Sequence, residues 1–180
     1  MRWVLERDAV GDTEAGLRDR NNPYDSVDPA PAARVIAREE IPTFAAALVD
    51  TSLPLFDRYK AMFSLRNAAE RAPRAAVLAL CEGFKDASPL FRHEVAYVLG
   101  QLAHAAAVPA LKARTEDVNE HDMVRHEAAE ALGAIGTGEC VDFLGAFTGE
   151  DVPTMLRESC QVARDVVDYW TAGETKEQAS

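Results

Sequence analysis

Apolar residues recur at intervals of three and four along much of this chain, which is the periodicity of an amphipathic helix. The two clearest stripes contain Leu90, Val95, Val98, Leu99 and Leu102, and Met123, Ala128, Ala131, Leu132 and Ile135. A small polar residue ahead of each stripe, often with proline in the first turn, predicts where the helices begin. These predicted starts are Ser52 before Pro54, Ser88 before Pro89, Asp122 alone, and Asp151 before Pro153. Shorter amphipathic stretches at about 33–49, 74–84, 107–114 and 140–147 lie between these helices.

The chain repeats itself with a nearly constant period. Four segments align on an arginine, and these arginines are Arg58, Arg92, Arg125 and Arg157, at spacings of 34, 33 and 32 residues. That period accommodates one helix-turn-helix unit. Alanine is abundant and long runs of β-branched residues are absent, which also favours helices. We therefore predict an all-α fold in which about four helical hairpins stack into a short α-solenoid.

Two features of the repeat indicate packing between helices. The arginine recurs in every repeat, so we interpret it as a structural residue that pairs with acids such as Asp86 or Glu158. Gly100 and Gly133 stand inside the helical pattern, where glycine costs about 1 kcal/mol relative to alanine. Their recurrence at one register predicts that neighbouring helices approach closely at these points.

The sequence changes character towards both ends. Residues 8–31 are acidic, polar and rich in turn-forming residues, without apolar periodicity, which is typical of a linker. Residues 1–7 include an apolar Trp3-Val4-Leu5 segment and are interpreted as the remnant of a preceding helix. The repeat domain is expected at 32–170, and residues 171–180 are expected to form a frayed polar tail.

Composition limits the classes of partner and compartment. The net charge of −11 disfavours nucleic acid, because phosphate binding needs a basic surface. This charge suits a basic ligand, with a role in solubility alone as the alternative. No segment approaches the roughly 20 apolar residues that span a bilayer, and the first residues form no secretory core. Cys81, Cys140 and Cys160 lack a Cys-x-x-Cys spacing, so we interpret them as reduced thiols of a cytoplasmic protein.

Two consecutive repeats carry the same His-Glu dipeptide directly after the arginine, as His93-Glu94 and His126-Glu127. Adjacent residues of one helix point about 100° apart, so a single pair does not readily chelate an ion. On neighbouring helices about 8–10 Å apart, both imidazoles can reach one metal through bonds of about 2.1 Å. One glutamate then completes a set of two histidines and one carboxylate, which is the ligand set of oxygen-activating Fe(II). The other glutamate remains free to hold a cationic substrate.

Other metal motifs do not match this spacing. A zinc-protease motif needs a second histidine where Tyr97 and Glu130 stand, and the Glu-x-x-His motif of di-iron helix bundles is absent. The alternative interpretation is that both histidines pair with acids on a solvated face. Repetition at one register favours the metal site. His104 and His121 lie outside the register and are interpreted as ordinary surface or loop histidines.

Several segments are similar to one enzyme family. They are residues 26–31, 55–67, 91–102 and 123–135, and Arg157-Glu158-Ser159-Cys160. Together they resemble deoxyhypusine hydroxylase, and the likeness runs from about Ser26 to Tyr169. The resemblance implies a HEAT-repeat solenoid and a non-haem di-iron monooxygenase. Enzymes of this family use O₂ to hydroxylate the deoxyhypusine side chain of eukaryotic translation factor 5A, which completes hypusine.

The resemblance also assigns residue roles. His93, His126 and Glu127 would correspond to iron ligands, and Glu94 would correspond to a catalytic glutamate that engages the cationic deoxyhypusine chain. The division of roles between the two glutamates stays open, so both are candidate ligands. The implied metal is Fe(II), the co-substrate is O₂, and the partner is the deoxyhypusine-bearing translation factor.

The sequence departs from the family in its extent. Family members carry four His-Glu pairs in two similar halves, whereas this sequence has two pairs and resembles the C-terminal half. Three explanations remain open: a truncated product, one half of a split enzyme that needs an N-terminal half, or a homodimer that rebuilds a four-pair site. The alternative function is a non-catalytic HEAT-repeat scaffold that binds a basic protein.

Overall fold

The computed structural model describes residues 36–177, and every regular element within that range is helical. Four helical hairpins follow one another along the chain: α2 (Ile41–Val49) with α3 (Leu55–Ala68), α4 (Pro73–Cys81) with α5 (Pro89–Leu102), α6 (Val108–Glu116) with α7 (Asp122–Ile135), and α8 (Gly138–Leu144) with α9 (Thr154–Glu177). Short 3₁₀ turns adjoin α2, α4 and α6, and they are η1 (Arg38–Glu40), η2 (Glu82–Lys85) and η3 (Ala105–Ala107). The prediction of an all-α chain of about four hairpins is confirmed.

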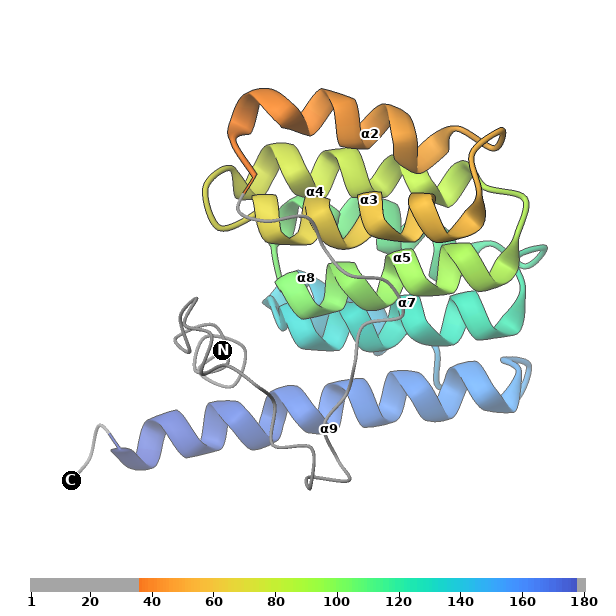
Figure 1. Ribbon diagram of the computed structural model, residues 1–180. Helices are drawn as coiled ribbons and strands as arrows, with labels where there is room; N and C mark the ends of the chain where they lie inside the picture. The colour runs from red at the N-terminus through yellow and green to blue at the C-terminus, as the bar shows by residue number, and fades with distance from the viewer. Residues whose placement is uncertain (1–35, 178–180) are drawn as a thin grey trace, which may run out of the picture.

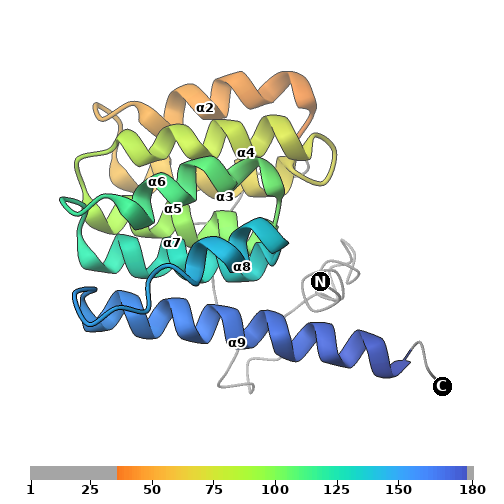
Figure 2. The same cartoon turned by 180° about the vertical axis from the view of Figure 1, so that it is seen from behind.

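The hairpins stack in sequence order as a two-layer solenoid (Figures 1 and 2). Helices α3, α5, α7 and α9 form one layer, and α2, α4, α6 and α8 form the other. The apolar stripes meet between the layers, because each helix alone exposes one apolar face. Large side chains that are almost completely buried there include Leu48, Phe63, Leu80, Leu99, Leu111, Leu132 and Leu144.

Helix α7 lies very close to both α5 and α9. A Cβ atom placed on Gly100 of α5 would lie 3.2 Å from the Cα of Ala131 on α7. A Cβ atom on Gly133 of α7 would lie only 2.6 Å from the Cβ and 2.9 Å from the Cα of Ala163 on α9. The predicted close approach at both glycines is confirmed, and it packs α5, α7 and α9 tightly side by side.

Two of the recurring arginines, Arg58 and Arg125, hold consecutive helices together, as expected for structural residues. The Nε atoms of Arg58 and Arg125 each donate to a carbonyl in the last turn of the preceding helix, at Leu48 (3.0 Å) and Thr115 (3.1 Å). Arg58 also pairs with the carboxylate of Asp86, one of the two acids that the sequence suggested. These bonds satisfy carbonyls that have no partner within their own helix.

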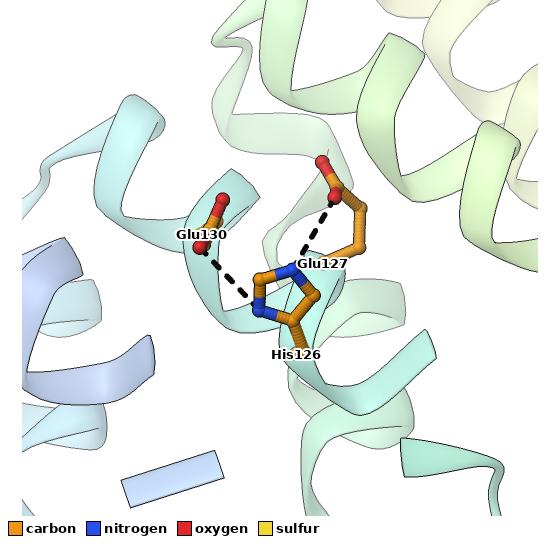
Figure 3. Close-up of side chains that lie close together, drawn as sticks. All are labelled: His126, Glu127 and Glu130. Carbon is orange, nitrogen blue, oxygen red and sulfur yellow. Dashed lines mark ion pairs between the residues drawn. The ribbon is translucent and has the colours of Figure 1, made fainter. Parts of the chain in front are cut away.

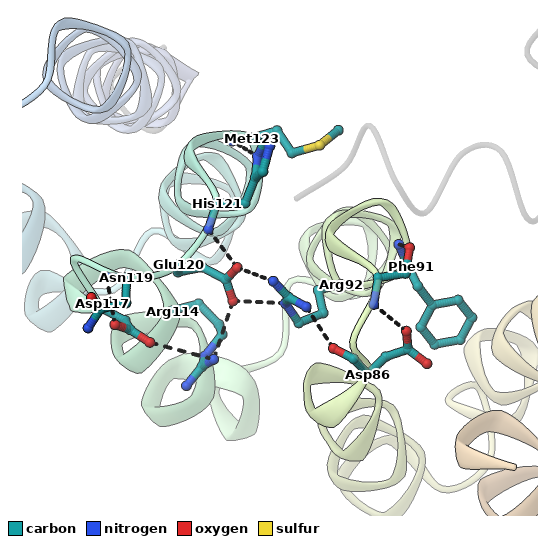
Figure 4. Close-up of polar contacts among 10 residues, drawn as sticks. Asp86, Phe91, Arg92, Arg114, Asp117, Asn119, Glu120, His121 and Met123 are labelled. Carbon is teal, nitrogen blue, oxygen red and sulfur yellow. Dashed lines mark hydrogen bonds and ion pairs between the residues drawn. The ribbon is translucent and has the colours of Figure 1, made fainter. Parts of the chain in front are cut away.

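Arg92 connects two loops through a buried acid (Figure 4). Its Nη1 donates to the carbonyl oxygen of Asp86 at 2.7 Å, and its Nε donates to Glu120 at 2.9 Å. The Glu120 carboxylate also accepts from the backbone N–H of His121 at 2.7 Å and lies 3.3 Å from Arg114. Burial by itself raises the pKa of Glu120, but the hydrogen bonds from Arg92 and His121 and both arginine charges outweigh it, so the pKa is lowered.

Two helix starts show where local sequence rules succeed and fail. Ser88 caps α5 as predicted, because its hydroxyl accepts from the backbone N–H of Phe91 at 3.4 Å. Ser52 does not cap α3, which begins at Leu55. Its hydroxyl and backbone N–H instead donate to the carboxylate of Asp50 at 2.6 and 2.9 Å.

The two histidines outside the repeat register have capping roles that the sequence did not predict. Nδ1 of His121 accepts from the backbone N–H of Met123 at 3.2 Å, so His121 rather than Asp122 caps α7. Nδ1 of His104 accepts from the backbone N–H of Ala106 at 3.0 Å and caps η3. Both rings therefore serve the backbone at helix N-termini.

The last helix continues farther than the sequence suggested. Helix α9 extends to Glu177, so residues 171–177 are helical where a frayed polar tail was expected. The predicted helix remnant at 1–7 and the predicted linker at 8–31 lie outside the described residues. Within the range 36–177, no helix is both long and apolar enough to cross a bilayer.

Candidate metal centre

Both His-Glu pairs lie on adjacent helices of the same layer. His93 and Glu94 stand in the second turn of α5, and His126 and Glu127 stand in the second turn of α7. The equal position follows from the repeat, because each dipeptide comes directly after the arginine that anchors its helix. The close packing of α5 on α7 at Gly100 then sets the two dipeptides side by side.

Two imidazole nitrogens approach one carboxylate oxygen. Nε2 of His93 lies 3.2 Å from Oε2 of Glu127, and Nε2 of His126 lies 4.0 Å from the same oxygen. A metal with bonds of about 2.1 Å holds neighbouring ligand atoms about 3 Å apart. The first separation already has this value, and the second is about 1 Å longer. Two histidines and one carboxylate are the donor set of non-haem Fe(II), so the residue types fit iron. In the group whose ligand atoms all lie within 4.8 Å of one another, however, Glu130 stands in place of His93, which approaches the group through Glu127.

Glu130 joins the cluster, and it was not predicted from the sequence as a site residue. Its Oε1 lies 3.4 Å from Nδ1 of His126, one helical turn away (Figure 3). One ligand atom each from His126, Glu127 and Glu130 lie within 4.8 Å of one another. The two carboxylates face different nitrogens of the His126 ring (Figure 3). A metal on Nε2 would therefore be held with Glu127, and a metal on Nδ1 with Glu130.

The electrostatics of the cluster favour a bound cation. Burial, followed by the negative charges of Glu130 and Glu94, raises the pKa of Glu127 to about 7. Burial, followed by the neighbouring His126, lowers the pKa of His93, and its Nδ1 is buried without a hydrogen-bond partner among the described residues. A divalent cation would stabilise the Glu127 carboxylate and accept the lone pair of a neutral imidazole.

Glu94 lies beside this cluster rather than in it. Its side chain is half-buried, and neither Glu94 nor His93 belongs to the group formed by His126, Glu127 and Glu130, but His93 approaches Glu127 directly at 3.2 Å. Burial, followed by the charge of Glu94, raises the pKa of Tyr59. The same charge contributes to the raised pKa of Glu127. Glu94 therefore acts electrostatically on groups of both α3 and α7.

A single register rule describes these contacts. In each repeat, the residue directly after the arginine faces the next repeat. There it interacts with the residue that stands two places after that repeat's own arginine. The pairs in contact are His93 with Glu127, and His126 with Ser159. In the second of these pairs, Ser159 Oγ lies 2.8 Å from His126 Nδ1. Tyr59 and Glu94 stand at the same register one repeat earlier, and the charge of Glu94 helps to raise the pKa of Tyr59. Ser159 was not predicted as a site residue, although its place two residues after the aligned Arg157 is the signal that identifies it.

Comparison with known proteins relates this geometry to characterised families. Residues 77–164 match the HEAT-repeat family, in agreement with the stacked hairpins. Deoxyhypusine hydroxylase from Danio rerio is 50% identical over 148 residues, which are 82% of this chain and 46% of that protein. The same enzyme from Mus musculus is 51% identical over 147 residues (82% and 46%), and that from Schizosaccharomyces pombe is 47% identical over 166 residues (87% and 51%). The chain belongs to the deoxyhypusine hydroxylase family.

A solved structure of this family has the same fold. Human deoxyhypusine hydroxylase in complex with glycerol superposes with a TM-score of 0.72 at 47% identity, covering 93% of this chain and 53% of that one. The predicted resemblance to deoxyhypusine hydroxylase and the predicted HEAT-type solenoid are thus confirmed. The chain spans about half the length of the curated relatives that it matches.

Proposed function

We propose that this chain contributes an iron-binding half-site to a deoxyhypusine monooxygenase. His93, His126 and Glu127 would hold Fe(II). The observation that carries the proposal is the approach of two imidazole Nε2 atoms, from neighbouring repeats, to the same oxygen of Glu127. Membership of the deoxyhypusine hydroxylase family supports the reaction class. The complete enzyme would contain two irons.

Bound iron would supply the activation of O₂: one oxygen atom would enter a C–H bond, and the other would leave as water after taking up two electrons from a reductant and two protons. The residues of this chain position the reactants. The three-residue donor set leaves coordination positions open for exchangeable ligands. The low exposure of Glu127, whose side chain is 12% accessible, strengthens its electrostatic interaction with a bound cation.

The substrate in this proposal is the deoxyhypusine side chain of translation factor 5A, which carries amino groups. The negative charge of Glu94 acts on Glu127, so the Glu94 carboxylate would attract an ammonium group of the substrate beside the proposed ligands. The net charge of −11 also attracts a basic protein partner and raises its association rate. Glu94 is thus the catalytic residue of the proposal, as it would touch the substrate.

The other ligands of a two-iron site would come from the half of the family fold that this chain does not span, or from a second copy of this chain. The described chain offers three ligands for one iron, and the family relatives are about twice as long. The three free cysteines fit a cytoplasmic location, where thiols stay reduced.

Anaerobic loading with Fe(II), followed by metal analysis and measurement of solution mass, tests the proposal. We expect His126→Ala to lose iron binding, because it removes one of three ligands. Glu94→Ala should retain iron but bind a deoxyhypusine-bearing peptide more weakly. His104→Ala is the matched control, since it removes a histidine that caps η3 away from the cluster, and it should retain iron.

The same experiment separates the oxygenase from the scaffold. A wild-type chain that binds no Fe(II), either alone or with a partner half, would favour the non-catalytic HEAT-repeat scaffold. Normal iron content in His126→Ala would refute the ligand assignment. An iron-free monomer would count against pairing of two copies of this chain.

A further inference from the structure

The layer formed by α3, α5, α7 and α9 ends with a serine at the register where the two preceding repeats carry a glutamate. Glu94 and Glu127 stand two residues after their arginines, and Ser159 stands two residues after Arg157. Ser159 lies in the second turn of α9, and only 6% of its surface is exposed. The close contact between Gly133 and Ala163 draws α9 onto α7 one turn farther along. A change of residue type at a buried, repeated contact indicates a specific role for the hydroxyl.

The hydrogen-bond geometry around Ser159 determines which partner is the donor. Ser159 Oγ lies 2.7 Å from the carbonyl oxygen of Met155 and 2.8 Å from Nδ1 of His126. A hydroxyl has one hydrogen, and a carbonyl oxygen accepts only. Ser159 therefore donates to Met155 and accepts from His126, whose Nδ1 must carry the proton.

Glu130 acts in the same direction from the other side. Its Oε1 lies 3.4 Å from the same Nδ1, and an ionised carboxylate accepts only. Two acceptors around Nδ1 favour the tautomer with a proton on that nitrogen. In a neutral ring this leaves the lone pair on Nε2, which is the nitrogen that faces Glu127 at 4.0 Å.

We propose that Ser159, supported by Glu130, is a positioning residue that fixes the orientation and tautomer of His126 so that its Nε2 lone pair points at the metal position. This inference rests on the proposed iron-binding function. It also assigns Glu130 to the support of the ligand His126 rather than to the metal. A metal on Nδ1 with Glu130 would require Ser159 to give up its bond to Met155 or to leave Nδ1.

Nitrogen-15 NMR of the metal-free full chain, labelled at its four histidines, reads the tautomer directly. The measurement is made at about pH 8.5, roughly two units above the unperturbed imidazole pKa of about 6.5. The His126 signal is assigned from its loss in His126→Gln. We expect a proton on Nδ1 in the wild type and in Ser159→Thr, which keeps the hydroxyl. In the double variant Ser159→Ala with Glu130→Gln, the population should shift towards a proton on Nε2.

Anaerobic titration with Fe(II) alone is the second measurement. Loss of such supporting partners weakens metal affinity about 10- to 100-fold, and we expect this for the double variant. Ser159→Thr should remain within about 3-fold of the wild type, since the supporting hydrogen bond is retained. Ser64→Ala is the matched control, because Ser64 is also buried and its hydroxyl donates to the carbonyl of Lys60 at 2.6 Å. Far-UV circular dichroism verifies the helical content of each variant.

A proton on Nε2 of His126 in the wild type would overturn the proposal. So would an unchanged tautomer and unchanged affinity in the double variant. If the double variant does not fold, Glu130→Gln and Ser159→Thr take its place, and Ser159→Thr must then retain the wild-type tautomer. If the wild type binds no Fe(II), the proposed function fails, whereas the tautomer measurement still decides the role of Ser159.

Discussion

Replacement of Gly133 by alanine should destabilise the protein by opening the α7–α9 contact. The added methyl group would lie 2.6 Å from the Cβ of Ala163 and 2.9 Å from both its Cα and its carbonyl oxygen. Two of these three atoms belong to the backbone, which cannot move aside as a flexible side chain does. Helix α9 must therefore shift outwards, and this shift lengthens the contact between His126 and Ser159.

The size of the effect follows from two opposing contributions. Overpacking at a tight contact costs about 1–3 kcal/mol, and three contacts below 3.0 Å place Gly133 in the upper half of that range, at about 2–3 kcal/mol. Alanine in place of a mid-helix glycine returns about 1 kcal/mol through helix propensity. We expect a net loss of about 1–2 kcal/mol, which lowers the melting temperature of a chain of this size by roughly 2–8 °C.

Gly100→Ala is the matched control at the equivalent position of α5. There the new Cβ would lie 3.2 Å from the Cα and Cβ of Ala131, so a movement of a few tenths of an ångström relieves the contact. The gain in helix propensity then roughly balances the packing cost, and stability should change by less than about 1 kcal/mol. Thermal and urea unfolding followed by circular dichroism measure both variants. Equal or higher stability of Gly133→Ala would refute the close-packing argument.

Other predictions concern buried charges and thiols. Glu120→Gln should lower the free energy of unfolding by about 3 kcal/mol at neutral pH. Because the pKa of Glu120 is lowered in the folded state, this difference between variant and wild type should shrink as the pH falls below about 4.5. Urea unfolding at several pH values measures it, and a difference that does not change with pH would contradict the prediction. Arg58→Ala leaves Asp86 buried without its partner and should cost about 3–5 kcal/mol, whereas Lys85→Ala removes an exposed pair and should change stability by less than about 0.5 kcal/mol in the same assay. Burial raises the pKa of Cys81 and Cys160 to about 11. Iodoacetamide at about pH 8 should therefore alkylate these thiols at least about 10-fold more slowly in the native chain than in the unfolded chain. Equal rates of alkylation would refute their burial.

The repeat was accessible to sequence analysis because its signals are local. The arginine spacing and the apolar stripes predicted four hairpins, and the two mid-helix glycines predicted close contacts that the structure contains. Ser88 was identified as a cap for the same reason, since a cap binds a backbone group three residues away.

Contacts across several residues or between elements were harder to predict. Ser52 has the residue type and the position of an N-cap, but its hydroxyl donates to the carboxylate of Asp50 instead. His104 and His121 cap helices through ring nitrogens, a role that the usual list of capping residues does not include. The polar composition of residues 171–177 suggested fraying, although this segment continues the long amphipathic helix α9.

The sequence by itself determined the helical repeat and the recurrence of histidine and glutamate at one register, because both depend on spacing along the chain. Only the tertiary structure decided which atoms meet. The distance between helices and the side-chain rotamers bring His93 and His126 towards Glu127, and they turn Nδ1 of His126 to Ser159 and Glu130. The choice between two nitrogens of one ring depends on hydrogen-bond partners from another repeat, and no local pattern encodes it.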